Sequence, residues 1–113
     1  MAMAKSPHRS DGERDQLVQH ELVALAAYLA GADRKTVDTE DIAVKANEIA
    51  PGRFSWRKYK DQIDLDLIYK HLWDLTKEDK GAMVTGSKKA GWLLTPAGAA
   101  FGEREVAKLE NLK

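Results

Sequence analysis

The sequence predicts a mostly α-helical domain with one small β-hairpin, an α+β fold in the order helix, short strand, helix, helix, strand, strand, helix. Before residue 80, three segments carry apolar residues at spacings of three and four, which is the repeat of an α-helix. After Gly81 the pattern changes to two short β-prone runs joined by a glycine-flanked loop. A helical segment follows Pro96. At 113 residues, the chain has the length of a single domain with one modest core.

The first helix is predicted over residues 12–31. Its apolar stripe steps by four, three and four residues through Val18, Leu22, Leu25 and Leu29. Gly31 is a suitable residue to end it, because glycine readily takes the left-handed conformation found after helix ends.

The second helix is predicted over 39–50, with Asp38 or Thr39 as its cap. Two acids stand in its first turn, where the helix dipole favours negative charge. Its buried stripe is Ile42, Ala46 and Ile49. Pro51 and Gly52 end it.

The third helix is predicted over 62–79, and Asp61 or Asp64 is expected to cap it. Its apolar residues step by three, four and three through Leu65, Ile68, Leu72 and Leu75. Gly81 follows its end.

The hairpin is predicted over 82–95, with strands at 82–85 and 92–95. Thr95 offers a hydroxyl cap for the last helix, predicted over 96–111. Pro96 suits the first helical position because the N–H that it lacks would have no partner there.

These stripes also predict the core, and Val37 could add a third short strand to the hairpin. The expected core residues are Leu22, Leu25, Leu29, Ile42, Ile49, Leu65, Ile68, Leu72, Leu75 and Leu94.

The composition excludes several classes of protein. There are no cysteines, so disulfides, thiolate zinc sites and cysteine nucleophiles are excluded, and a reducing compartment fits. The longest apolar run is too short to span a bilayer, and the N-terminal segment has no apolar run typical of a secretory signal. We therefore expect a cytoplasmic protein with a flexible tail over 1–10 and one domain over 11–113.

Charge is unevenly distributed along this chain of zero net charge. Residues 51–60 and 81–95 contain no acid, whereas the predicted second and third helices are acidic. The bases of the two acid-free segments are Arg53, Arg57, Lys58, Lys60, Lys88 and Lys89. If the two segments share a face, a neutral protein still presents a basic patch.

The segment GWLLTPAG carries a more specific pattern. Trp92, Leu94, Thr95 and Gly98 match the aromatic-x-Leu-Thr-x-x-Gly sequence with which small bacterial winged-helix regulators commonly leave their second wing strand. Together with the order of the elements, this pattern makes the chain resemble a winged helix-turn-helix domain of the small bacterial DNA-binding regulator type. The resemblance covers roughly residues 11–112.

The resemblance implies a DNA-binding role in transcription regulation, with 39–50 as the support helix, 64–79 as the recognition helix and 86–91 as the wing. Lysines at the wing would face the phosphate backbone, and two lysines of the recognition helix would point into the major groove. The expected DNA-binding residues are Arg53, Arg57, Lys58, Lys60, Lys70, Lys77, Lys88 and Lys89.

Two features depart from the family pattern. The segment between the second and third helices is longer than the usual turn. The front of the third helix carries Asp61, Asp64 and Asp66, which either cap the helix or would repel phosphate. Either the basic segment 53–60 supplies the main DNA contacts, or the winged helix binds protein.

Three functions therefore stay open: double-stranded DNA binding, protein interaction, and single-stranded nucleic-acid binding with Trp56 and Tyr59 as stacking residues. Leu17, Val106, Leu109 and Leu112 could form a homodimer through the first and last helices. No enzyme, metal or cofactor is expected, because the three histidines are scattered and no phosphate-binding loop is present.

Overall fold

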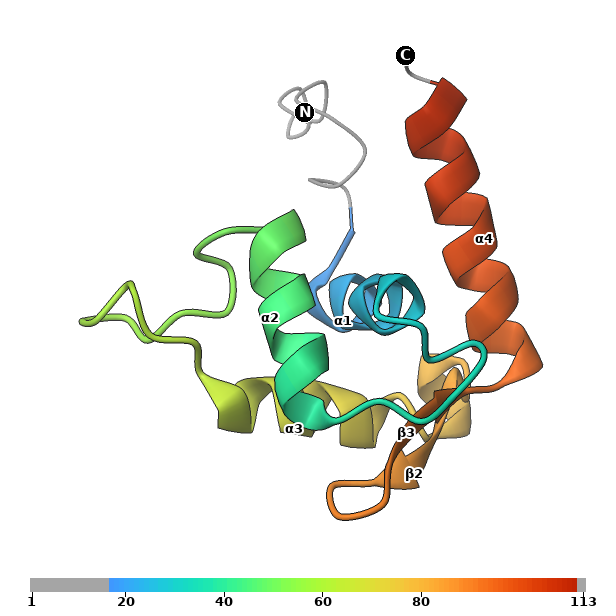
Figure 1. Cartoon of the computed structure of the whole chain (residues 1–113), viewed down its shortest axis with the longest axis horizontal. Coiled ribbons are helices and arrows are strands. Elements are labelled where there is room, and N and C mark those ends of the chain that lie inside the picture. Colours follow the sequence, from blue (N-terminus) through green and yellow to red (C-terminus); the bar gives the residue numbers. More distant parts are fainter. Residues whose placement is uncertain (1–16, 112–113) are drawn as a thin grey trace, which may run out of the picture.

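The computed structural model describes residues 17–111. Four α-helices and a two-stranded antiparallel hairpin follow in the expected order, so the α+β class is confirmed (Figure 1). The elements are α1 (Gln19–Leu29), α2 (Thr39–Ile49), α3 (Leu65–Asp74), the short 3-10 helix η3 (Glu78–Lys80), β2 (Val84–Ser87), β3 (Gly91–Leu94) and α4 (Pro96–Asn111). The tail 1–10 and the expected helical residues 12–16 lie outside the described residues.

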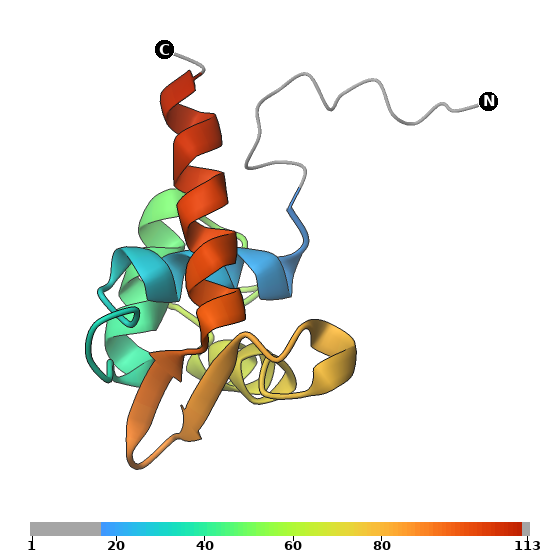
Figure 2. The same cartoon turned by 90° about the vertical axis from the view of Figure 1, so that its right-hand side faces the viewer.

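Helix α1 is the centre of the arrangement, and α2, α3 and α4 all pack against it. Strand β3 also contacts α1. The hairpin lies beside α3, where the ring of Tyr69 faces that of Trp92. Helix α4 starts at the base of the hairpin and extends to the opposite side (Figures 1 and 2). In the described part of the chain, no helix has both the length and the apolar content needed to cross a bilayer.

Two of the expected helix caps are present as hydrogen bonds. The backbone N–H of Leu67 donates to Oδ1 of Asp64 over 3.1 Å, so this carboxylate caps α3. The N–H of Gly98 donates to Oγ1 of Thr95 over 3.1 Å, and that hydroxyl donates to the carbonyl of Ala82. Thr95 therefore starts α4 and joins it to the hairpin at the same time.

Helix α3 is shorter than predicted, because it ends at Asp74 and not near residue 79. The Thr76 hydroxyl donates to the Trp73 carbonyl over 2.6 Å, an interaction that favours a helix end. The carbonyl of Leu75 accepts hydrogen bonds from Met83 and Val84 beyond the turn. These long-range bonds hold the returning chain against the end of α3, where another helical turn would otherwise continue.

The short first strand is reduced to one bridge. Val37 and Trp92 exchange two backbone hydrogen bonds of 2.9 Å each, on the side of β3 that faces away from β2. In the hairpin itself, Val84 pairs with Leu94 and Gly86 with Trp92. The backbone of Trp92 therefore joins the segment before α2 to the hairpin.

The core agrees with most of the predicted residues, with three corrections. Leu29 is 40% exposed, and Ile49 and Leu65 are only partly buried. Helix α1 is covered by other elements on several sides, so it buries the continuous run Leu22–Ala27 and not one narrow stripe. Its last residue, Leu29, lies beyond that cover.

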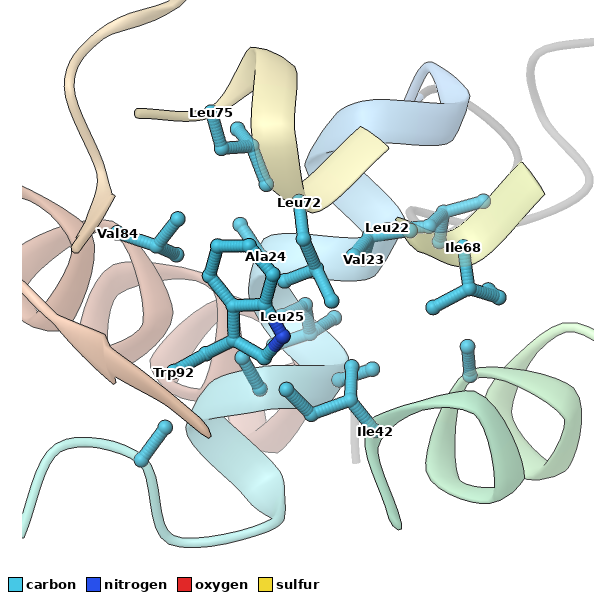
Figure 3. Close-up of a cluster of buried hydrophobic side chains, with 14 of the residues drawn as sticks. Leu22, Val23, Ala24, Leu25, Ile42, Ile68, Leu72, Leu75, Val84 and Trp92 are labelled. Atoms are coloured by element: carbon cyan, nitrogen blue, oxygen red, sulfur yellow. The ribbon is translucent and has the colours of Figure 1, made fainter. Parts of the chain in front are cut away.

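Trp92 and Phe54 are the largest fully buried side chains, and neither was among the expected core residues. Figure 3 shows the indole of Trp92 reaching from β3 into the cluster formed by Leu25, Leu72 and their neighbours. Its Nε1 donates a 2.8 Å hydrogen bond to Oγ1 of buried Thr39. The only polar atom of the indole is thereby satisfied within the core.

Two glycines of α4 allow close packing. A Cβ at Gly98 would collide with the carbonyl oxygen of Met83, and one at Gly102 would collide with the ring of Tyr28. Helix α4 therefore approaches the hairpin at Gly98 and α1 at Gly102 more closely than any other residue type would allow. Gly98 of the GWLLTPAG segment thus has a packing role.

Replacing Thr39 with valine should destabilise the fold, because the isosteric side chain leaves the buried Trp92 N–H without an acceptor. We expect a loss of about 1–3 kcal/mol in the free energy of unfolding. Urea denaturation followed by tryptophan fluorescence measures it, and Thr39→Ser, which keeps the hydroxyl, is the control. Equal stability of Thr39→Val and wild type would show that the hydrogen bond contributes little.

Candidate nucleic-acid interface

The outward face of α3 is the surface that the sequence assigns to recognition. Asp66, Lys70 and Trp73 are exposed there, opposite the buried residues Ile68 and Leu72. These positions step by four and three residues, so they form one stripe along the helix. Lys70 therefore lies on the outward face, as predicted.

Lys77 lies elsewhere. It precedes η3 and is not part of α3, because the helix ends three residues earlier. Its Nζ lies 3.7 Å from Oδ1 of Asp74, an exposed ion pair that contributes little to stability. The expectation that Lys77 points from the recognition helix is corrected by this early helix end.

The tip of the hairpin turns one lysine toward α3. Lys88 and Lys89 are both exposed, and Nζ of Lys88 lies 5.0 Å from the centre of the Tyr69 ring. This distance fits a cation–π contact. The Tyr69 ring in turn lies 6.0 Å from that of Trp92. The lysine at the tip is thus connected to the core through two aromatic rings.

The long segment between α2 and α3 folds as an irregular hairpin, which we call the basic loop (residues 51–63). Ser55 pairs with Ile63 in an antiparallel bridge, and the N–H of Trp56 donates to the Gln62 carbonyl over 3.0 Å. The predicted bases Arg53, Arg57, Lys58 and Lys60 are all exposed on this loop. The loop therefore presents its charges from a defined structure.

Side chains from three elements fix the base of this loop. Phe54 is fully buried, and its carbonyl accepts a 2.7 Å hydrogen bond from the N–H of Asp64. Gln19 of α1 donates through Nε2 to the Arg53 carbonyl over 3.0 Å. The same amide meets Nε2 of His71 on α3 through its Oε1, over 3.3 Å.

Sequence reasoning missed this cluster, in which His71 is half-buried, contacts Gln19 and lies edge-on to Phe54. The available signal was Phe54 itself, an apolar residue within a basic segment. Its partners on α1 and α3 could not be found from local spacing.

The two basic segments lie at different places along α3. Figure 1 shows the loop extending beyond the start of α3, whereas the hairpin lies toward the other end of that helix. Two hollows of about 240 and 430 Å³ lie beside the first turn of α3, and Glu40 and Leu65 line both. Lys88 lines the first hollow and Asp61 the second. Carboxylates therefore line the same hollows as the hairpin lysine and the end of the basic loop.

The acids at the start of α3 have different roles. Asp64 caps the helix, whereas Asp66 is exposed on the outward face beside Lys70. Among residues 17–111, no three histidine or acidic side chains lie close enough together to hold a metal ion.

The apolar residues expected at a dimer contact are partly used within the chain. Leu17 and Val106 pack against the core of the chain itself. Leu109 is partly buried, and Leu112 lies outside the described residues. Dimer formation through the first and last helices stays a prediction.

The stability of this region should depend on pH through His71. Burial, followed by the charge of His20, lowers the pKa of His71 below its ordinary value of 6.5, although Asp74 opposes the shift. The unfolded chain then binds a proton more readily than the folded one, so stability is highest above pH 6.5 and decreases as the pH falls.

We expect the urea midpoint of the wild type to fall between about pH 7.5 and about pH 5.5. The midpoint of His71→Gln should fall less, because glutamine stays neutral and can still contact Gln19. Parallel pH profiles of the two proteins would contradict this role of His71.

A scan against protein-family models, a search of curated proteins and a search of solved structures each find no match to this chain. The function proposed below is therefore supported by the residues of the chain itself, namely the outward face of α3 and the two basic segments beside it.

Proposed function

We propose that this domain is a winged helix-turn-helix that binds double-stranded DNA, as a small regulator or as the DNA-contacting part of a larger assembly. The order of its elements supports the proposal, since a helix pair is followed by a hairpin and a closing helix. The bridge between Val37 and Trp92 adds a short third strand position to that hairpin. The hairpin would be the wing, and α3 the recognition helix.

The observation that carries the proposal is the placement of exposed bases around α3. The helix presents Lys70 outward, the basic loop precedes its first turn, and Lys88 lies against Tyr69 beside its middle. A helix in the major groove has phosphates on both sides, which suits bases at two separate places better than a single patch.

The charge of the domain limits the strength of this binding. The net charge is zero, and Glu40, Asp61 and Asp66 are exposed near the proposed contact face. Binding therefore depends on a few local phosphate contacts, and it should be weak at high salt.

A second function is favoured by one observation. Trp73 is 49% exposed on the outward face of α3, and exposed tryptophans are frequent at the centres of protein–protein contacts. If duplex DNA fails to bind at low salt, this face would instead be a protein-interaction surface.

Removing the two lysines of the proposed wing should weaken DNA binding without affecting the fold. For Lys88→Gln/Lys89→Gln, the slope of log K against log salt should fall in magnitude by about 1.8, or about 0.9 for each lost phosphate contact. Affinity should fall by a similar factor on every sequence, because phosphate contacts do not read bases. Mobility shifts with random duplexes at several salt concentrations measure both effects.

The matched control is Arg104→Gln/Lys108→Gln, which removes two charges from exposed positions on α4, the helix that leads away from the hairpin (Figure 2). Glutamine at position 108 can still donate to Glu105, the present partner of Lys108. An equal loss of affinity in the control would mean that only total charge matters. An unchanged slope in the lysine double variant would exclude the wing as a DNA contact.

Substitutions of the two acids at the start of α3 should have different effects, one on duplex binding and the other on stability. Asp66→Asn should tighten duplex binding, because an exposed carboxylate is removed from the contact face without loss of a cap. Asp64→Ala should instead lower the stability by about 1 kcal/mol, since the cap of α3 is lost. Unchanged affinity of Asp66→Asn at low salt would show that α3 does not enter a groove in this orientation.

A further inference from the structure

The basic loop carries two aromatic rings that the core does not use. Trp56 is 49% exposed and Tyr59 is 54% exposed. Their ring centres lie 6.3 Å apart with an angle of 68° between the planes, which is an edge-to-face pair. A side chain with as much apolar area as tryptophan is usually well buried. Here large parts of both rings face the solvent and are accessible to a ligand.

The backbone holds this pair in a defined arrangement. The bridge between Ser55 and Ile63 closes the loop, and the N–H of Gln62 donates to the Tyr59 carbonyl over 3.0 Å. Below the bridge, Phe54 is fully buried. Because the loop is already folded, a ligand that contacts the rings does not have to order a flexible segment.

Bases outnumber acids in the basic loop, whose one acid is Asp61. Residues 51–60 contain four bases and no acid, and Nζ of Lys58 lies 5.9 Å from the centre of the Tyr59 ring. Within residues 17–111, no base of this loop makes an ion pair. Bases without an acidic partner beside exposed aromatic rings suit a ligand that combines phosphates with flat bases.

We propose that the basic loop binds unpaired nucleotides, with bases stacked on Trp56 and Tyr59 and phosphates held by Arg57 and Lys58. Every base has a flat face that can stack on an aromatic ring, and a basic surface follows the backbone of the strand, so such binding tolerates any sequence. The site shares the bases of the basic loop with the proposed duplex contact, but it adds the two rings and therefore goes beyond the duplex binding proposed above.

The test measures the anisotropy of labelled oligo(dT) of about twelve nucleotides. Trp56→Ala and Tyr59→Ala should each weaken binding about fivefold or more, the loss expected for one stacked base. Leu29→Ala is the control, since Leu29 is also an exposed apolar residue, 40% exposed, but lies at the end of α1 and outside both proposed contact surfaces. It should bind the oligonucleotide as the wild type does. Oligo(rU) of the same length shows whether RNA or DNA is the preferred strand.

Two further variants separate stacking from charge and from folding. Trp56→Phe keeps a ring and should retain most of the affinity, whereas a general defect of the loop would not be rescued. In a Trp73→Phe background, Trp56 is the exposed indole, and its fluorescence should be quenched by the oligonucleotide.

The proposal is overturned if oligo(dT) does not bind, or if Trp56→Ala binds as tightly as wild type while Arg57→Gln/Lys58→Gln loses affinity. Binding of duplex DNA without binding of oligo(dT) would refute this site and leave the duplex proposal standing. Binding of oligo(dT) that depends on Trp56, without binding of duplex DNA, would support this site and refute the duplex proposal.

Discussion

The buried indole of Trp92 is the interaction on which the position of the hairpin depends. A two-stranded hairpin has marginal stability by itself, so it must be held by the rest of the fold. Trp92 supplies three connections: its ring fills the core, its Nε1 donates to Thr39 at the start of α2, and its backbone pairs with Val37. The lysines at the hairpin tip can act on a partner only because this ring fixes the strand that carries them.

The basic loop is held in the same way by a different ring. Phe54 is buried beneath it, and the amide of Gln19 joins the loop backbone to α1 and to His71 of α3. Each of the two basic segments is therefore connected to the helical body through one fully buried aromatic side chain. The charges themselves are exposed, and fixing their positions depends on apolar burial and not on ion pairs.

The features that could be predicted from the sequence are those with a local cause. Apolar spacing predicted α1, α2 and α3, and the Thr95–Pro96 pair predicted the start of α4. The hydroxyl of Thr95 and the carboxylate of Asp64 form the expected caps. Features with long-range causes were missed. Helix α3 ends early because the returning chain bonds to Leu75, and Phe54 finds its place among residues from distant parts of the sequence. The same reason explains why the placement of the two basic segments around α3 could not be read from charge patterning.

The net charge of the chain is zero, but its acids and bases stand at different places in the fold. Acids occupy the first turns of α2 and α3, where the helix dipole favours them, and exposed bases occupy the basic loop and the hairpin tip. At physiological salt the Debye length is about 8 Å, so an exposed charge acts mainly on its close neighbours. A strand of phosphates at the loop or at the hairpin tip would therefore respond to the local bases more than to the net charge of zero. Zero net charge thus limits long-range attraction between this domain and nucleic acid, but it does not exclude contact binding.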